Sequence, residues 1–217
     1  MDKFGPNWRD HPARIAAIWH KLIGPDDLVL IAGDISWALR FPEALPDLEW
    51  IDALPGRKVL TKGNHDFWWD GARKKNAVVP PSLTLVEAQA VRVGDWVVCG
   101  TRGWVTPGQP FYKPEDDEKI YKREQGRLEL ALAAAKLLAA DGAPIAVLLH
   151  FPPFTGDGTP TPFAEQLAAA GVTLCVYGHL HRRHDWLQAV QGVRDGVEYH
   201  LTSCDFLGFT PKLLRRE

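Results

Sequence analysis

The sequence predicts an α/β fold in which several short strands end close together. Short apolar runs, such as those at residues 28–32 and 144–149, are bounded by turn or polar residues, which is typical of buried strands. Segments with helical spacing of apolar residues lie between these runs. Polar side chains follow four of the runs directly, and strand ends in open α/β sheets face a common crevice. We therefore expect those polar side chains to meet at one point.

The first elements are a helix and two strands. Residues 10–23 have helical spacing, with Asp10 as a possible cap and Pro12 in the first turn. A short buried strand is expected at residues 28–32, before Asp34. A loop and a helix ending near residue 54 follow, and the next strand, at 59–61, opens into the sequence Gly-Asn-His-Asp. These two strands carry the first two polar endings.

The middle of the chain has closely spaced strand signals. Residues 83–88, 89–93 and 95–100 are rich in β-branched and apolar residues, and Gly94-Asp95 suits a hairpin turn. We expect an antiparallel section of sheet here. Residues 101–118 form a long segment rich in turn residues, and loops of this length are often functional.

The last part of the chain alternates helices and strands. Acidic residues followed by Ala and Leu at helical spacing predict one long helix over residues 116–140. The remaining expected elements are strands at 144–149, 172–177 and 197–202, with a short helix at 163–170. With no repeat or linker in sight, residues 1–217 are expected to form a single domain.

Composition excludes some classes of function. The formal net charge of −2 gives no basic surface for gripping nucleic acid. No apolar run approaches the roughly 18 residues needed to span a bilayer. The three cysteines, Cys99, Cys175 and Cys204, are odd in number and far apart, which favours buried free thiols over a disulfide framework. We expect a cytoplasmic protein that does not bind a membrane.

The polar residues at the strand ends have the chemistry of metal ligands. Asp34 offers a carboxylate that can bridge two cations, and Asn64 offers a neutral amide oxygen. His150, His179 and His181 offer imidazole nitrogens. Mixed oxygen and nitrogen donors suit Mn, Fe, Zn or Ni better than Mg or Ca. The sequence therefore predicts a site for divalent cations, with the exact metal left open.

The order of these motifs resembles one enzyme family. The motifs are GDISWA, GNHDFWW, HFPPF and GHLH, and in this order and spacing they are similar to the calcineurin-like metallophosphoesterases. The resemblance implies a four-layer α/β/β/α sandwich with mixed sheets. It also implies a hydrolase with a dinuclear metal centre, for which manganese is one candidate, acting on a small phosphate monoester or diester.

The resemblance also implies residue roles. Asp34 would bridge both metals, and Asn64, His150 and His179 would complete one of them, while His181 would bind the other. Two cations about 3.5 to 4 Å apart lower the pKa of a bridging water and hold the ester for attack. By its match to the motif, His65 would stabilise the transition state or protonate the leaving oxygen. Asp66 beside it would fix its tautomer.

One motif of the family is missing. The family begins with Asp-x-His on its first strand, and no histidine here has an aspartate two positions before it. Glu198-x-His200 is the nearest substitute, although nothing in the sequence places it beside Asp34. A missed upstream start is the preferred interpretation, so the first strand is expected to be missing. We expect this chain to bind at most about one metal firmly and to be slow or inactive, and an N-terminally extended version to hydrolyse p-nitrophenyl phosphate.

Alternatives remain open at the level of the sequence. The chain could be a weak or inactive scaffold for protein interaction, although His65 and Asp66 would have no purpose there. A nuclease is disfavoured by the acidic charge. Lys62 and Arg102 could contact a substrate phosphate or could be structural. Three tryptophans near the ligands could wall the pocket, stack on a base or sugar, or belong to the core: Trp37, Trp68 and Trp69.

Overall fold

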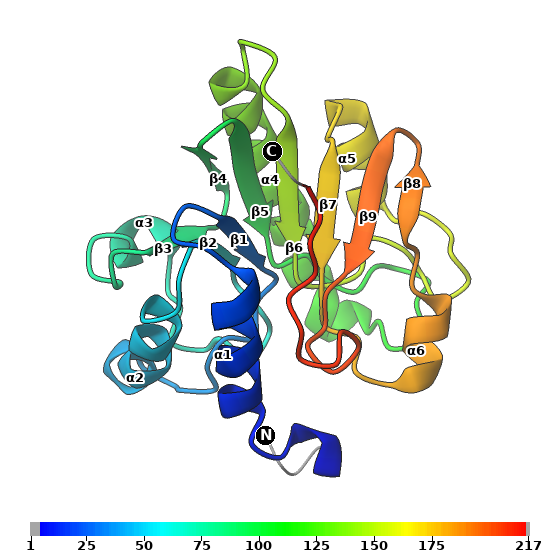
Figure 1. Cartoon of the computed structure of the whole chain (residues 1–217). Helices are drawn as coiled ribbons and strands as arrows, with labels where there is room; N and C mark the ends of the chain where they lie inside the picture. The colour runs from blue at the N-terminus through cyan, green and yellow to red at the C-terminus, as the bar shows by residue number, and fades with distance from the viewer. Residues whose placement is uncertain (1–4, 216–217) are drawn as a thin grey trace.

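Two β-sheets pack face to face at the centre of the molecule, and helices cover their outer faces (Figure 1). The structure is a computed structural model that describes residues 5–215. Among those residues, one sheet is parallel with the order β1-β2-β3, and the other is mixed with the order β4-β5-β6-β7-β9-β8. This arrangement confirms the α/β prediction and matches the four-layer sandwich that the family resemblance implied.

The parallel sheet is formed by β1 (Leu28–Ile31), β2 (Arg57–Thr61) and β3 (Leu83–Val86). The prediction that residues 83–88 belong to an antiparallel section was wrong, because β3 pairs in parallel with β2. The chain leaves this sheet after Val86 and enters the other sheet at Gln89, through Ala88 in the left-handed region at φ 56°. The strands β3 and β4, which are adjacent in the sequence, thus belong to two different sheets.

The mixed sheet contains the remaining strands. The predicted hairpin at Gly94-Asp95 is confirmed by the antiparallel pairing of β4 with β5. Strands β5, β6, β7 and β9 run parallel to one another. The strand bounds are β4 (Gln89–Val93), β5 (Trp96–Thr101), β6 (Ile145–Leu149), β7 (Leu174–Tyr177), β8 (Gly192–Arg194) and β9 (Val197–Leu201).

Helices follow the prediction in the long segments and depart from it in the short ones. The confirmed helices are α1 (His11–Leu22), α2 (Phe41–Asp52), α4 (Pro114–Leu138) and α5 (Pro162–Ala170). The sequence analysis missed a 3₁₀ turn at Pro6–Trp8 and the short helices α3 (Ala72–Lys75) and α6 (Arg183–Gln188), because each is too short for a periodic pattern. Asp10 precedes α1 but makes no side-chain capping bond.

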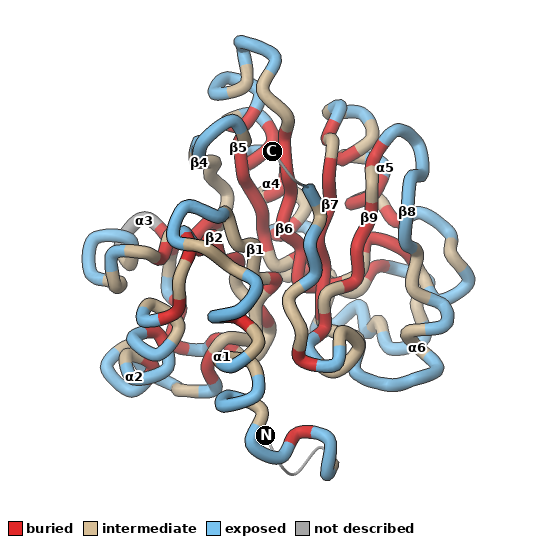
Figure 2. Tube along the Cα trace, in the orientation of Figure 1, coloured by how far each residue is buried: buried red, intermediate tan, exposed pale blue. Residues whose placement is uncertain are grey.

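Alternation along the strands divides the core into layers (Figure 2). On β6, Val147 and Leu149 pack toward α4 and α5, whereas Ala146 and Leu148 pack toward the parallel sheet. A third cluster, between the parallel sheet and α2, includes Trp68 and Trp69. The core interpretation of these two tryptophans is therefore confirmed.

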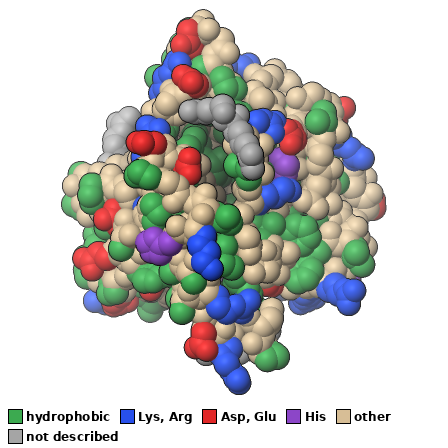
Figure 3. Space-filling model, in the orientation of Figure 1, with side chains coloured by type: hydrophobic (Ala, Val, Ile, Leu, Met, Phe, Trp, Pro, Cys, Tyr) green, Lys and Arg blue, Asp and Glu red, His purple; other side chains and the backbone are tan. Residues whose placement is uncertain are grey.

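A cavity of about 1690 Å³ lies beside β1. All four β1 residues line it and are only half-buried, whereas every residue of β6 is buried. In the part of the chain that the structure describes, β1 has a strand neighbour on one side only. Hydrophobic side chains surround a hollow on this face of the molecule (Figure 3). The cavity also reaches the ends of β1 and β7, where the predicted site lies.

Two further features can be compared with the sequence analysis: the burial of the cysteines and the length and apolar character of the helices. Cys99 and Cys175 are buried free thiols, as predicted, whereas Cys204 is exposed. Burial raises the pKa of Cys99 to about 12, which keeps this thiol protonated and inert. In the described part of the chain, none of the helices combines the length and the apolar character that crossing a bilayer requires.

Glu124 is a fully buried carboxylate on α4. Its side chain accepts hydrogen bonds from Thr101 Oγ1 at 2.5 Å, Arg102 Nη2 at 3.3 Å and Arg127 Nη1 at 2.9 Å. These contacts connect α4 to the C-terminal end of β5. The buried acid therefore joins a helix of the outer layer to the edge of the sheet that carries the predicted site.

We expect Glu124→Ala to lower the free energy of unfolding by about 2–3 kcal/mol, because it leaves a hydroxyl and part of two guanidinium groups without their partner. Glu124→Gln keeps the shape and one acceptor, so its loss should be smaller. Urea unfolding followed by circular dichroism measures both. Equal stability of wild type and Glu124→Ala would show that water replaces the carboxylate without cost.

Candidate functional site

Four strand ends deliver polar side chains to one point. Asp34 follows β1, Asn64 follows β2, His150 follows β6 and His179 follows β7. The Asn64 amide oxygen lies 2.8 Å from His150 Nε2 and 3.0 Å from His179 Nδ1. These two nitrogens are 3.1 Å apart, and Asp34 Oδ2 lies 3.5 Å from His150 Nε2. The structure thus brings together the four side chains that the sequence analysis grouped.

Both imidazoles of this cluster are neutral, with His150 buried and His179 half-buried. Burial lowers the pKa of His150 to about 3. Burial, followed by repulsion from His150, lowers the pKa of His179 to about 3 as well. His150 Nδ1 lies 2.8 Å from the Ala32 carbonyl oxygen, which can only accept, so Nδ1 carries the proton. The other nitrogen, Nε2, then presents a lone pair to the cluster, as metal-binding histidines do.

This tautomer leaves an electrostatic conflict inside the cluster. His150 Nε2 faces the amide oxygen of Asn64 and a carboxylate oxygen of Asp34, and none of these three atoms carries a proton. Acceptors at such distances repel unless a cation or a proton lies between them, and His179 Nδ1, at 3.0 and 3.1 Å from two of them, is the nearest atom that can carry such a proton. The donor set therefore fits a divalent cation. Among the described residues, no group of three or more His, Cys, Asp and Glu side chains forms a metal site by itself, and this set depends on the amide of Asn64.

Two glycines allow the loops after β1 and β2 to interlock. Gly33 has φ 87°, and a Cβ added to it would lie 2.6 Å from Gly63 N. A Cβ on Gly63 would lie 2.0 Å from Asp34 Oδ1. Asp34 itself is held at φ 57°, and its Oδ1 accepts from His65 N–H at 2.9 Å. His179 is also left-handed, at φ 70°. Backbone strain of this kind is concentrated at functional sites.

Asp66 connects the same two loops from beneath. Its carboxylate is fully buried. It accepts hydrogen bonds from the backbone N–H groups of Asp34, Ile35, Ser36 and Gly63 and from Trp68 Nε1, at 2.8 to 3.1 Å. Burial raises the pKa of Asp66, and the donations from Ser36, Gly63 and Ile35 oppose that rise.

The sequence analysis expected Asp66 to fix the tautomer of His65. In the structure, both carboxylate oxygens of Asp66 accept hydrogen bonds from backbone and indole N–H groups instead. His65 is positioned by aromatic side chains instead. Its imidazole stacks on Trp37, with ring centroids 4.6 Å apart and an interplanar angle of 25°, and meets Phe67 edge-on at 6.2 Å. Asp66 therefore acts on the site through the backbone.

His181 lies at the margin of the cluster. Its Nδ1 is 2.9 Å from Asp205 Oδ1, and its ring meets Trp8 edge-on. It lines the same cavity as Asp34 and His179. Asp205 was missed by the sequence analysis, although it stands shortly after the last strand, where a polar residue can reach a site at the strand ends.

Glu198 and His200, which the sequence offered as a substitute ligand pair, have other partners. The two side chains bond to each other at 2.9 Å on β9. Arg215 pairs with Glu198, and Lys212 Nζ lies 3.0 Å from His200 Nδ1. These contacts therefore connect the C-terminal segment to β9 rather than completing the cluster at Asp34.

The two basic candidates also have partners within the protein. Lys62 Nζ donates to the Trp69 carbonyl oxygen at 2.5 Å. The Arg102 guanidinium pairs with Glu124 and lies 4.3 Å over the Trp104 ring. The Arg102 carbonyl accepts from His150 N–H at 3.0 Å, so this residue fixes the backbone of a site residue. Contact of either cation with a substrate phosphate stays a prediction.

Comparisons with known proteins agree with the motif order. A sequence model of the calcineurin-like phosphoesterase family matches residues 8–183. The gene 66 proteins of Mycobacterium phages L5 and D29 are 44% and 42% identical to a segment of 57 residues. That segment is 26% of this chain and 27% and 28% of the phage proteins, so the chain spans about a quarter of the length of these relatives.

Proposed function

This chain belongs to the calcineurin-like phosphoesterase family, and from this premise we propose that it hydrolyses small phosphate esters with the help of a divalent cation. The observation that supports the proposal is the contact of three unprotonated acceptors on Asp34, Asn64 and His150. A cation between these atoms would convert their repulsion into attraction. A purely structural role does not require four strand ends to bring their metal-binding side chains together at one point.

The proposed cation would be held by Asp34, Asn64, His150 and His179. This set of one carboxylate, one amide and two imidazoles suits Mn, Fe, Zn or Ni. When bound, such a cation supplies Lewis acidity that activates water and polarises a phosphoryl oxygen. The neutral imidazoles need no deprotonation before binding, because burial already keeps the pKa of both well below neutrality.

A second cation would have a weaker set of ligands. One Asp34 oxygen already accepts from His65 N–H, and His181 is paired with Asp205. We therefore propose one firmly held cation, with Asp34 and His181 as the ligands available to another.

His65 is the proposed proton donor to the leaving group. Its backbone is fixed by Asp34 and its ring by Trp37. The ring lines the same cavity as the cluster, so it can reach a phosphate ester held there. Asp66 supports this arrangement by holding the loops that carry Asp34 and His65.

The test is hydrolysis of p-nitrophenyl phosphate and bis(p-nitrophenyl) phosphate by the purified chain after chelation and reloading with Mn²⁺. We expect slow hydrolysis that depends on metal, with about one cation bound per chain because only one ligand set is complete. Asn64→Ala should weaken metal binding roughly tenfold or more, since it removes the central oxygen of the set. Elemental analysis and dialysis with Mn²⁺ measure binding directly.

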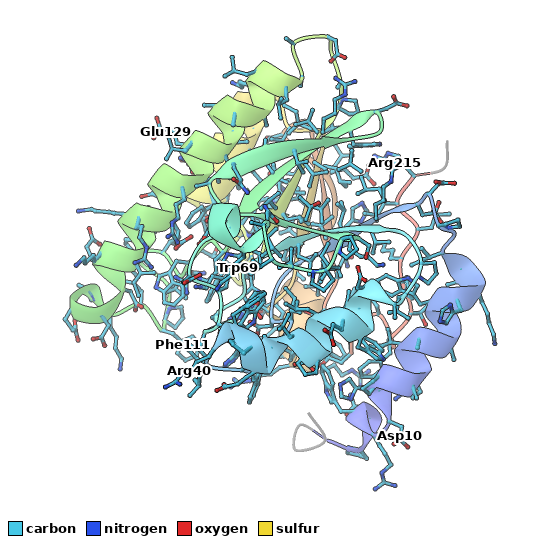
Figure 4. The ribbon with its side chains drawn as sticks, turned by 90° about the vertical axis from the view of Figure 1, so that its left-hand side faces the viewer. Asp10, Arg40, Trp69, Phe111, Glu129 and Arg215 are labelled. Atoms are coloured by element: carbon cyan, nitrogen blue, oxygen red, sulfur yellow. The ribbon has the colours of Figure 1, made fainter. Side chains whose placement is uncertain are left out.

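Glu129→Ala is the matched control, because Glu129 is exposed on the outer side of α4, away from the site (Figure 4). It should bind metal and turn over like the wild type. A folded wild-type chain that binds no cation and hydrolyses neither ester would contradict the proposal and favour the alternative of a scaffold for protein interaction. Comparison of the two esters separates monoesterase from diesterase activity.

A further inference from the structure

We propose that Trp37 makes this site selective for phosphate esters that carry a flat aromatic group, such as an aryl or nucleobase ring. The inference rests on the proposed function and adds the class of substrate. It is carried by the place of Trp37 next to His65, by its partial exposure and by the rigidity of its loop.

Trp37 lies beside the residue that is proposed to protonate the leaving group. His65 is the proposed donor to the leaving oxygen, and the indole stacks on its imidazole at 4.6 Å between centroids. A ring attached to that oxygen would therefore extend toward Trp37. Both residues line the cavity that contains Asp34 and His179.

Exposure distinguishes Trp37 from the neighbouring tryptophans. Trp37 is 38% exposed, whereas Trp68 and Trp69 are 2% and 1% exposed in the core. Phe67, on the other side of His65, is 58% exposed. Aromatic and apolar surface beside a few convergent polar groups is the usual composition of a small-molecule site.

The loop that carries Trp37 is fixed on both sides. Ser36 N–H donates to Asp66 at 3.0 Å, and Ser36 Oγ donates to Asp47 Oδ2 at 2.5 Å. Ala38 N–H donates to Ser36 Oγ at 3.3 Å. The indole is thus pre-organised, so a ligand that stacks on it does not have to order the loop first.

The experiment uses phenylphosphonate and methylphosphonate, which share a charged head group and resist hydrolysis because their phosphorus is bonded to carbon. Their dissociation constants are measured by calorimetry with the whole chain in Mn²⁺. We expect phenylphosphonate to bind about tenfold tighter, since stacking of one ring on an aromatic side chain has an effect of this order. Trp37→Leu should abolish the preference, and Trp37→Phe should retain most of it.

Trp50→Leu is the matched control, because Trp50 is also 38% exposed and lines the same cavity, but from α2 rather than from the loop after β1. It should keep the wild-type preference. An equal preference in wild type and Trp37→Leu, with both folded by circular dichroism, would overturn the role of Trp37 and leave the proposed hydrolysis standing. Failure of both phosphonates to bind the wild type would overturn the phosphate site itself.

Discussion

Asp66→Ala is expected to lower the free energy of unfolding by about 3–5 kcal/mol and to abolish hydrolysis. The change removes one buried carboxylate and leaves five N–H donors around it without an acceptor. Each unsatisfied buried donor costs on the order of 1 kcal/mol or more, and relaxation of the loops offsets part of that cost. Urea unfolding and the p-nitrophenyl phosphate assay measure the two effects.

Asp66→Asn is the informative partner of this variant. It keeps the size of the side chain and one oxygen, but its amide NH₂ group must face N–H donors. We expect a loss of stability smaller than that of Asp66→Ala, together with a large loss of activity, because the loops after β1 and β2 would shift. Full activity in either variant would show that these loops hold their geometry without the carboxylate.

Gly63→Ala is expected to reduce hydrolysis about 100-fold, because a displacement of about 1 Å at a site can have an effect of this size. The added Cβ would lie 2.0 Å from Asp34 Oδ1 and 2.2 Å from Asp34 N. Asp34 must move away, and the distance between its carboxylate and the cluster must then change. The measurements are the hydrolysis rate and the Mn²⁺ dissociation constant.

Gly126→Ala provides the matched control for the same chemical change. Gly126 lies in α4, and nothing lies within 4 Å of a Cβ built on it. Alanine in a helix should raise the free energy of unfolding by about 0.5–1 kcal/mol and leave activity unchanged. Similar activities for Gly63→Ala and Gly126→Ala would mean that the close approach of the two loops does not matter for the site.

The sequence predicted the position of the site because its signals are local. An apolar run followed by glycine and a polar residue identifies the end of a strand, and parallel strands place their ends at one edge. That reasoning found Asp34, Asn64, His150 and His179 and predicted their convergence. Their roles as metal ligands remain a proposal.

The sequence could not predict the partners that these residues choose. Asp66 binds backbone N–H groups, which every residue except proline carries, so no pattern indicates the choice. Glu124 was read only as part of a long helix, because one buried carboxylate cannot be told from its exposed neighbours by spacing. The sheet to which β3 belongs depends on a contact with β2, distant in sequence. Such features are decided by tertiary packing.

The half-buried strand β1 gives the site two halves of unequal stiffness. His150 and His179 follow β6 and β7. These two strands lie inside the larger sheet, each has a strand neighbour on both flanks, and all of their residues are buried. Among residues 5–215, the strand that precedes Asp34 is paired on one flank only, and local opening of such a strand requires less free energy. The larger sheet therefore fixes the two imidazoles, whereas the position of the Asp34 carboxylate depends on the loop contacts of Asp66 and on the hydrogen bond that Asp34 accepts from His65 N–H.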